Sequence, residues 1–183
     1  MPVTQRVVGD SATERVRTAL GDKVSEVANN FDQVDLVCSP DNLVEVVTAL
    51  RDGDLGFRFF TFLSAVDRSE LAEDKSRFGH KLEVLIHLYS PEHATHVNIH
   101  VPIEVAKPVC PSITGVFQGA EWHERECHEM FGIDFAGHPR LVNLYLPEDF
   151  EGNPGLKSFK LPSRALVKPW PGAKDPEEAA GGK

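Results

Sequence analysis

The chain has 183 residues, 41% of them hydrophobic, and a formal net charge of −9. Such a chain suits one domain with a real core plus a tail, and its negative charge argues against a surface for nucleic acid or anionic lipid. No apolar run is long enough to span a bilayer, and the N-terminus MPVTQRVVGD lacks the apolar core of a secretory signal. We therefore expect a cytoplasmic, soluble protein that reaches a membrane only through a partner.

The cysteines Cys38, Cys110 and Cys127 lie far apart in the sequence. An odd, sparse set of this kind does not indicate a disulfide framework. It also lacks the four thiolates that usually hold an iron–sulfur cluster. We expect buried free thiols.

The N-terminal part of the chain shows signals for helices and strands in turn. Ser11 and Glu14 have the spacing of a capping box. Ser39 followed by Pro40 is typical of a helix cap and first turn. The sequence predicts helices over residues 12–20 and 39–52, strands over residues 24–28, 34–38 and 57–63, and a charged loop over residues 67–77.

Two alternating runs follow, over residues 82–89 and 96–101. Their spacing predicts an antiparallel hairpin with one core face and one solvated face. A helical region is expected from Pro111 to Phe131, broken near Gly119 and ended by Gly132. Together these elements predict an α+β domain over residues 1–135, in which helices pack on a mixed, mostly antiparallel sheet.

From residue 136 onward, repeated prolines exclude a long helix or a central strand, although apolar residues continue as far as Trp170. So long a stretch without regular structure indicates either disorder or an arm laid on a partner. The apolar residues favour an extended arm over residues 136–183, and residues 175–183 are expected to fray.

The helix that precedes this arm is dense in charge. Glu121, Arg125 and Glu129 follow one another at a spacing of four residues, so neighbouring pairs can meet on one helix face. A metal site built on the same helix from His123, Cys127 and His128 is the sharpest alternative. However, the two histidines lie about 140° apart around a helix, and the pair on one face, His123 and Cys127, does not make a zinc site.

Four other histidines are candidate functional groups. His96 and His100 are roughly 13 Å apart along a strand, too far for one metal. His87 lies on the other strand of the hairpin and adds one ligand at best, so a solvated strand face is the simpler interpretation. His138 stands in the irregular segment, either as a titrating group on a functional path or, as we favour, as a residue that pins a loop.

Several spaced motifs together resemble the thirty-kilodalton subunit of NADH:quinone oxidoreductase (respiratory complex I). The close resemblance covers roughly a quarter of the chain, and elsewhere only the order of elements agrees. The motifs are Glu121-Trp122-His123-Glu124-Arg125-Glu126, Glu129-Met130-Phe131-Gly132-Ile133, Gly137-His138-Pro139 and Pro147-Glu148-Asp149-Phe150-Glu151-Gly152.

The resemblance implies a structural subunit of the peripheral arm of a complex that transfers electrons from NADH to quinone and translocates protons. The chain itself would carry no catalytic, cofactor-binding or metal-binding residue. Flavin, iron–sulfur clusters and quinone would lie on partner subunits: the large quinone-site subunit and neighbouring iron–sulfur subunits, on the cytoplasmic side of the cell membrane. Charged residues of the helix would form an interface or an ionic network beneath the arm. The residues expected at the interface are Trp122, Glu124, Arg125, Glu126, His138, Glu148, Asp149 and Lys157.

The chain departs from the family pattern at Val142 and Asn143, where arginines are usual, and again over residues 152–158. These departures leave open an equivalent subunit of a related complex that uses reduced F420 or ferredoxin, or of a membrane-bound nickel–iron hydrogenase. A free-standing metal-dependent enzyme and a binding adaptor unrelated to electron transfer are the rivals from other classes. No glycine-rich nucleotide motif is present, so the resemblance does not place an NADH site on this chain.

Overall fold

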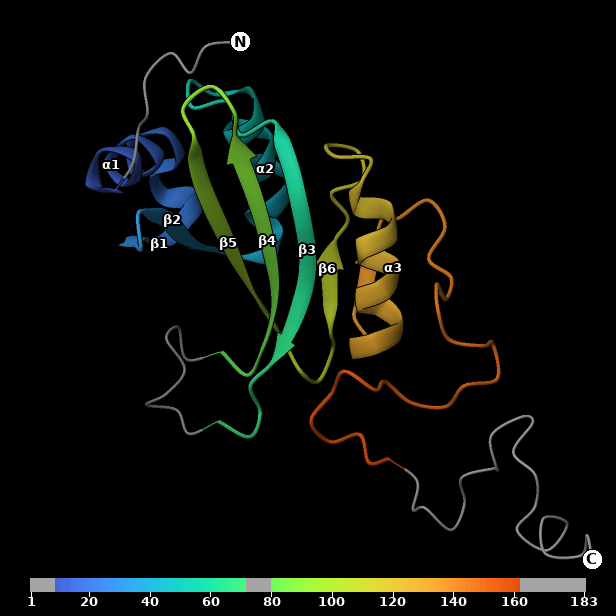
Figure 1. Cartoon of the computed structure of the whole chain (residues 1–183). Helices are drawn as coiled ribbons and strands as arrows, with labels where there is room; N and C mark the ends of the chain where they lie inside the picture. Colours follow the sequence, from blue (N-terminus) through green and yellow to red (C-terminus); the bar gives the residue numbers. More distant parts are fainter. Residues whose placement is uncertain (1–8, 72–79, 162–183) are drawn as a thin grey trace, which may run out of the picture.

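The computed structural model describes residues 9–71 and 80–161. They form a five-stranded sheet of order β1-β2-β5-β4-β3, a small two-stranded sheet of β6 and β7, and three α-helices (Figure 1). The elements are α1 (Gly9–Leu20), the 3-10 turn η1 (Gly21–Lys23), β1 (Val24–Asn30), β2 (Gln33–Cys38), the 3-10 turn η2 (Pro40–Asn42), α2 (Leu43–Asp52), β3 (Phe59–Asp67), β4 (Leu82–Ser90), β5 (Thr95–Ile103), β6 (Val109–Pro111), α3 (Ala120–Phe131) and β7 (Asp134–Ala136).

The large sheet is mixed and mostly antiparallel, as the sequence predicts. Strands β1 and β2 form one antiparallel hairpin, and β3, β4 and β5 form an antiparallel meander. The seam between these two units is parallel, with Leu36 of β2 opposite Ile99 of β5. Together with the helices, this arrangement confirms the α+β class.

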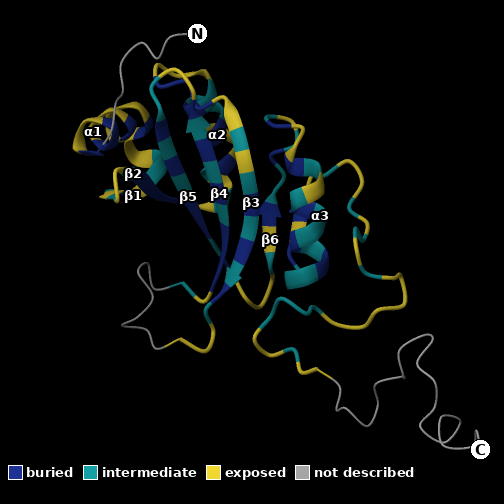
Figure 2. Ribbon diagram, in the orientation of Figure 1, coloured by how far each residue is buried: buried dark blue, intermediate teal, exposed yellow. Residues whose placement is uncertain are grey.

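The core follows the alternation in β4 and β5. Val84, Ile86 and Ile99 are fully buried on one face of the sheet, and α1 and α2 cover that face through Val16 and Val47, which are also buried (Figure 2). Helix α3 instead packs beside the edge strand β3. The helices α1 and α2 therefore cover one face of the sheet, and α3 covers its β3 edge.

Two predicted helix starts differ from the structure. Helix α1 already begins at Gly9, so Ser11 lies inside the helix and not at its cap. Ser39 makes no side-chain cap bond; its carbonyl accepts a hydrogen bond from the Asn42 amide at 3.1 Å, and a 3-10 turn precedes α2. Pro40 is compatible with the first turn of either a 3-10 helix or an α-helix, because the N–H at that position has no partner within the helix.

The predicted helix from Pro111 to Phe131 is wrong before Ala120. Residues 109–111 form strand β6, which pairs in parallel with β7, and turns lie at residues 114–116 and 118–119. Strand β6 is too short for periodicity to reveal it. Strand β3 also begins two residues later than predicted, because the amides of Phe57 and Arg58 donate to the carbonyls of Leu50 and Gly56 and not to a neighbouring strand.

The turn between β1 and β2 is strained. Phe31 and Asp32 both have positive φ, 50° and 62°, in a two-residue loop where Asn-Gly is favoured. A bulky residue in the left-handed region costs about 1–2 kcal/mol. The Phe31 side chain gains no packing in return, since it is 93% exposed.

Residues 137–161 contain no helix or strand and none of them is buried. They run along α3 and past the end of the large sheet (Figures 1 and 2). Leu141 and Leu156 are partly buried and pack against the core. Trp170 and the terminal segment 175–183 lie outside the described residues. Within the described ranges, none of the helices has the length and apolar character needed to cross a membrane.

Candidate interface formed by helix α3 and the arm

Helix α3 ends as expected, with Gly132 in the left-handed conformation (φ 71°) and its amide donating to the His128 carbonyl at 2.9 Å. One row of the helix enters the domain and includes Ala120 and Cys127. Its other rows face the arm and the surrounding surface. The helix is thus the element on which the candidate interface is built.

Glu124 lies inside the domain and is fully buried. Its Oε1 accepts the Ile113 amide at 2.7 Å, whereas its Oε2 is buried without a hydrogen-bond partner. Burial raises the pKa of the Glu124 carboxyl, and hydrogen bonds from Ser112 and Ile113 oppose that rise without cancelling it. In the isolated chain this residue braces the turns before α3 and presents no surface to a partner.

Arg125 and Glu129 fasten the arm to the helix. The Arg125 guanidinium donates to the carbonyls of Val142 and Asn143 at 2.9 and 2.8 Å. The buried Glu129 carboxylate accepts the amides of the next three residues, 144–146, at 2.8 to 3.2 Å. The charged side chains of Arg125 and Glu129 therefore bond to backbone groups of the arm. The sequence instead predicts pairs between the charged side chains themselves. Among the described residues no ion pair joins these helix charges, so they do not form the ionic side-chain network that was the alternative to an interface.

Three further contacts continue the attachment. The Asn153 side chain donates to the Glu129 carbonyl at 2.9 Å, and the Gly155 amide donates to the Met130 carbonyl at 2.7 Å. The Lys157 amide donates to Asp67 Oδ2 at 2.7 Å. Burial alone would raise the pKa of Asp67, but the amides of Lys157 and Ser69 outweigh it and lower that pKa. Lys157 thus contributes its backbone to the arm while its side chain stays exposed.

His138 pins the first loop of the arm. The Arg140 amide donates to its Nδ1 at 3.0 Å, so Nε2 carries the proton of the neutral ring and donates to the Glu121 carbonyl at 3.1 Å. Both ring nitrogens are engaged. This is the loop-pinning role that the sequence favours.

The alternative metal residues on α3 point to different partners. His123 Nδ1 lies 3.0 Å from the Leu63 carbonyl of β3, and His128 Nδ1 lies 3.0 Å from the Ile133 carbonyl. Cys127 is buried, and burial raises the pKa of its thiol. In residues 9–71 and 80–161, no group of three or more histidine, cysteine and acidic side chains has the geometry to hold a metal ion. All three cysteines are buried free thiols, as predicted.

The histidine face of the hairpin is less solvated than predicted. His87 Nε2 lies 3.2 Å from His96 Nδ1, which makes a pair and no larger cluster. Glu83 is fully buried and contacts both Arg68 and His100. Burial alone would raise the pKa of Glu83, but hydrogen bonds from His100 and Arg68 outweigh it and lower that pKa. A buried ionic cluster thus interrupts this face.

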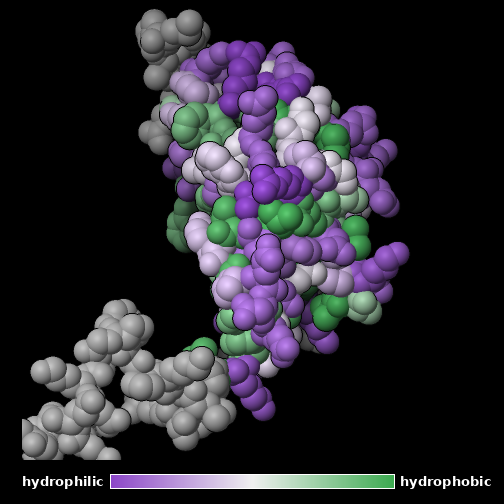
Figure 3. Space-filling view, turned by 90° about the vertical axis from the view of Figure 1, so that its right-hand side faces the viewer, coloured by the Kyte–Doolittle hydropathy of each residue, from purple (hydrophilic) through white to green (hydrophobic). Residues whose placement is uncertain are grey.

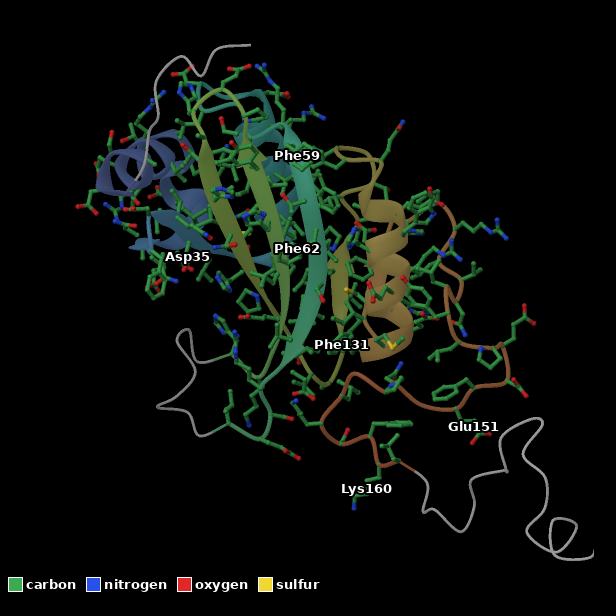
Figure 4. All side chains as sticks on the ribbon, in the orientation of Figure 1. Asp35, Phe59, Phe62, Phe131, Glu151 and Lys160 are labelled. Atoms are coloured by element: carbon green, nitrogen blue, oxygen red, sulfur yellow. The ribbon has the colours of Figure 1, made fainter. Side chains whose placement is uncertain are left out.

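Large apolar side chains gather on the outer surface of α3 and the arm. Trp122 and Tyr145 are each 65% exposed, and Val142 and Phe150 are also exposed. Figure 3 views this side of the molecule and shows hydrophobic residues in a band between hydrophilic regions. Figure 4 shows Lys160 on the arm pointing away from the domain. We call Trp122, Val142, Tyr145 and Phe150 the outer apolar patch.

The residues predicted at an interface divide into two groups. The outer group, exposed or partly exposed, comprises Trp122, Glu126, Glu148, Asp149 and the side chain of Lys157. The inner group, occupied within the chain, comprises Glu124, Arg125 and His138. Sequence reasoning missed Glu129, Asp67 and Asn153 as arm contacts. Of these three residues, only Glu129 could have been singled out from the sequence, because it fills the acidic position of the second motif.

Comparisons with known proteins agree with the resemblance. The family described as respiratory-chain NADH dehydrogenase, 30 Kd subunit, matches residues 36–165. A subunit of the NADH-quinone oxidoreductase of Roseiflexus sp. (strain RS-1) is 37% identical over 155 residues, covering 83% of this chain and 85% of the relative. A subunit of the NADH-quinone oxidoreductase of Salinispora arenicola (strain CNS-205) is 34% identical over 150 residues; they cover 82% of this chain but only 59% of the longer relative.

Two solved structures share the fold. A trypsin-resistant fragment of Nqo5 aligns with a TM-score of 0.56 at 22% identity, over 70% of this chain and 98% of the fragment. A chain of the membrane-bound sulfane sulfur reductase, an archaeal respiratory membrane complex, aligns with a TM-score of 0.66 at 19% identity, over 91% of this chain and 98% of that chain. The family match and the Roseiflexus relative both extend over most of the chain, and it therefore belongs to the family of the 30 kDa subunit of respiratory-chain NADH dehydrogenase.

Proposed function

We propose that the chain is a structural subunit of the peripheral arm of a complex I-type NADH:quinone oxidoreductase. Its work would be assembly and support of electron transfer from NADH to quinone, coupled to proton translocation. The observation that carries this proposal is the attachment of the arm by Arg125 and Glu129, which holds the outer apolar patch in one place. A fixed patch of exposed aromatic side chains is a typical interface anchor.

The same exposed surface indicates which partner subunits the chain would contact. The outer apolar patch and the acidic pair Glu148 and Asp149 would contact the large quinone-site subunit, and the remainder of the arm would reach neighbouring iron–sulfur subunits. Flavin, clusters and quinone would be held by those partners. The chain would meet the cytoplasmic side of the cell membrane only through the complex. Residues 1–135 would be the folded domain, and residues 136–183 the arm.

A truncation tests the role of the arm. The tagged full chain and a variant ending at residue 135 are each expressed in the native host, and partners are recovered from gently solubilised membranes. We expect the full chain to bring down flavin-bearing and cluster-bearing subunits in stoichiometric amount, and the truncated chain to bring down none. A chain ending at Leu161 is the matched control, because it keeps every arm contact described above.

The identity of the recovered subunits separates the related complexes. A subunit that binds NADH supports the proposal. A nickel-site large subunit, or an input subunit for reduced F420 or ferredoxin, would assign the chain to another complex of the same lineage. Full recovery of partners by the truncated chain would contradict the role given to the arm.

A further inference from the structure

The tip of the β1–β2 hairpin carries a feature that the interface around α3 does not use. Phe31 is 93% exposed, the largest value among the described large apolar side chains, and it has a φ of 50°. Asp32 beside it has a φ of 62°. A residue that is both strained in the backbone and unburied in the side chain gains no packing inside its own domain, which motivates the search for a role outside it.

The hairpin holds this side chain on a rigid base. Six residue pairs register β1 against β2, the last being Asn30 opposite Gln33, immediately beside the turn. Arg17 of α1 donates to the Val27 carbonyl at 2.7 Å, and the Asn29 side chain donates to Asp10 at 3.1 Å. An anchor fixed in this way loses little conformational freedom when a partner binds.

The surroundings of the tip are acidic. Asp10 contacts Asn29, and a Cβ placed on Gly9 would lie 3.4 Å from both the Asn29 side chain and Asp32 Oδ1. Asp10 therefore lies beside Asn29 at the base of the tip, and Asp32 stands next to Phe31 in the tip itself. Because the whole chain has a net charge of −9, a second copy of it is electrostatically unfavourable as the occupant.

We propose that Phe31 is an aromatic anchor that inserts into an apolar pocket, rimmed by lysine or arginine, on a neighbouring subunit of the complex. This inference rests on the proposed function for the existence of such a neighbour. It names a second contact, because β1 lies at the sheet edge opposite β3 and α3 (Figure 1). The protein would then be gripped at both ends of its sheet.

The first experiment replaces the tip with a favourable turn, Phe31→Asn together with Asp32→Gly. Since this pair suits the positive φ values, the isolated variant should unfold roughly 2–4 °C higher than the natural chain. Its affinity for the partially assembled complex should nevertheless fall roughly 30-fold, the loss typical of a hot-spot side chain. The single change Asp32→Gly, which relieves strain and keeps the ring, is the matched control and should retain binding.

Two results would overturn the proposal. The first is full recovery of the complex by the double variant. The second is a double variant that unfolds at a lower temperature than the natural chain, because Phe31 would then serve its own domain. Failure of the proposed function is distinguishable, since in that case the natural chain itself recovers no subunits.

A photo-crosslink identifies the occupant. Phe31→p-benzoylphenylalanine is placed in the tagged full chain, the assembled complex is illuminated in membranes, and the linked peptide is sequenced. We expect a peptide of another subunit of the complex with lysine or arginine near the linked position. A link to a second copy of this chain, or no link in an assembled complex, would contradict the anchor.

Discussion

The large sheet and the arm are held in place by different forces. In the sheet, Leu36, Ile86 and Ile99 are fully buried within one continuous core. In the arm, residues 137–161 include no buried residue, and a few polar atoms of α3 make the decisive contacts. The sheet therefore has many redundant apolar contacts, whereas the arm is attached mainly by a small number of polar contacts. We expect that the arm can be released without unfolding the domain.

The largest effect should come from the sheet. Ile99→Ala removes a fully buried side chain opposite Leu36 at the parallel seam, and should lower the free energy of unfolding by roughly 2–5 kcal/mol. Urea unfolding followed by circular dichroism measures this loss. Val105→Ala, at a side chain that is 59% exposed, is the control and should leave the midpoint unchanged. A loss of stability in Ile99→Ala no greater than that of the control would contradict the role given to the buried core of the sheet.

The next effect should be confined to the arm. Glu129→Gln removes the charge and one of the two oxygens that accept the amides of residues 144–146, which should weaken the attachment by about 2 kcal/mol. Hydrogen exchange should speed up at these amides while the amide of Ile99 keeps its protection. Glu151→Gln, on an exposed side chain of the same arm, should change neither. Equal acceleration in sheet and arm would mean that the two regions unfold together.

A smaller effect, with the opposite sign, is expected at the buried carboxyl of α3. The raised pKa of Glu124 means that the folded chain holds a proton more tightly than the unfolded chain does. Its contribution therefore weakens as the pH rises above 4.5, the value without burial. Glu124→Gln should gain roughly 1 kcal/mol at neutral pH and nothing near pH 4. Unfolding at both pH values measures this, and a gain that does not depend on pH would contradict the assignment.

The smallest effect on stability should come from the outer apolar patch. Trp122 is 65% exposed, so Trp122→Ala should change the free energy of unfolding by less than about 0.5 kcal/mol. Recovery of partner subunits should fall sharply in the same variant. Val105→Ala again serves as the control, with recovery unchanged. A large loss of stability in Trp122→Ala would show that this side chain supports the domain itself.

The periodic parts of the fold were predictable from the sequence. Strands β4 and β5 follow their alternation, and the class of sheet follows from the hairpins. Strand β6 was missed because three residues that pair with β7 carry no period. The capping box at Ser11 was misplaced because the helix begins two residues earlier, at Gly9 with its positive φ.

The candidate site was less predictable than the fold. Trp122 was found as an exposed aromatic among charges, and the structure places it on the surface. The pairing of Arg125 with its neighbours was wrong, because carbonyls of the arm compete for the guanidinium. Asp67 was out of reach of any local pattern, since its partner amide belongs to Lys157, 90 residues later.

The parallel seam between β2 and β5 also affects how the chain folds. Asp35 and Asn98 form a hydrogen bond across it at a separation of 63 residues. Closing this loop therefore costs more conformational entropy than forming either hairpin. At a synthesis rate of about 5–20 residues per second, β5 leaves the ribosome several seconds after β2. Throughout that interval Val34 and Leu36 lack their cross-strand neighbours Val97 and Ile99, and we expect the exposed apolar strand to favour aggregation of the nascent chain.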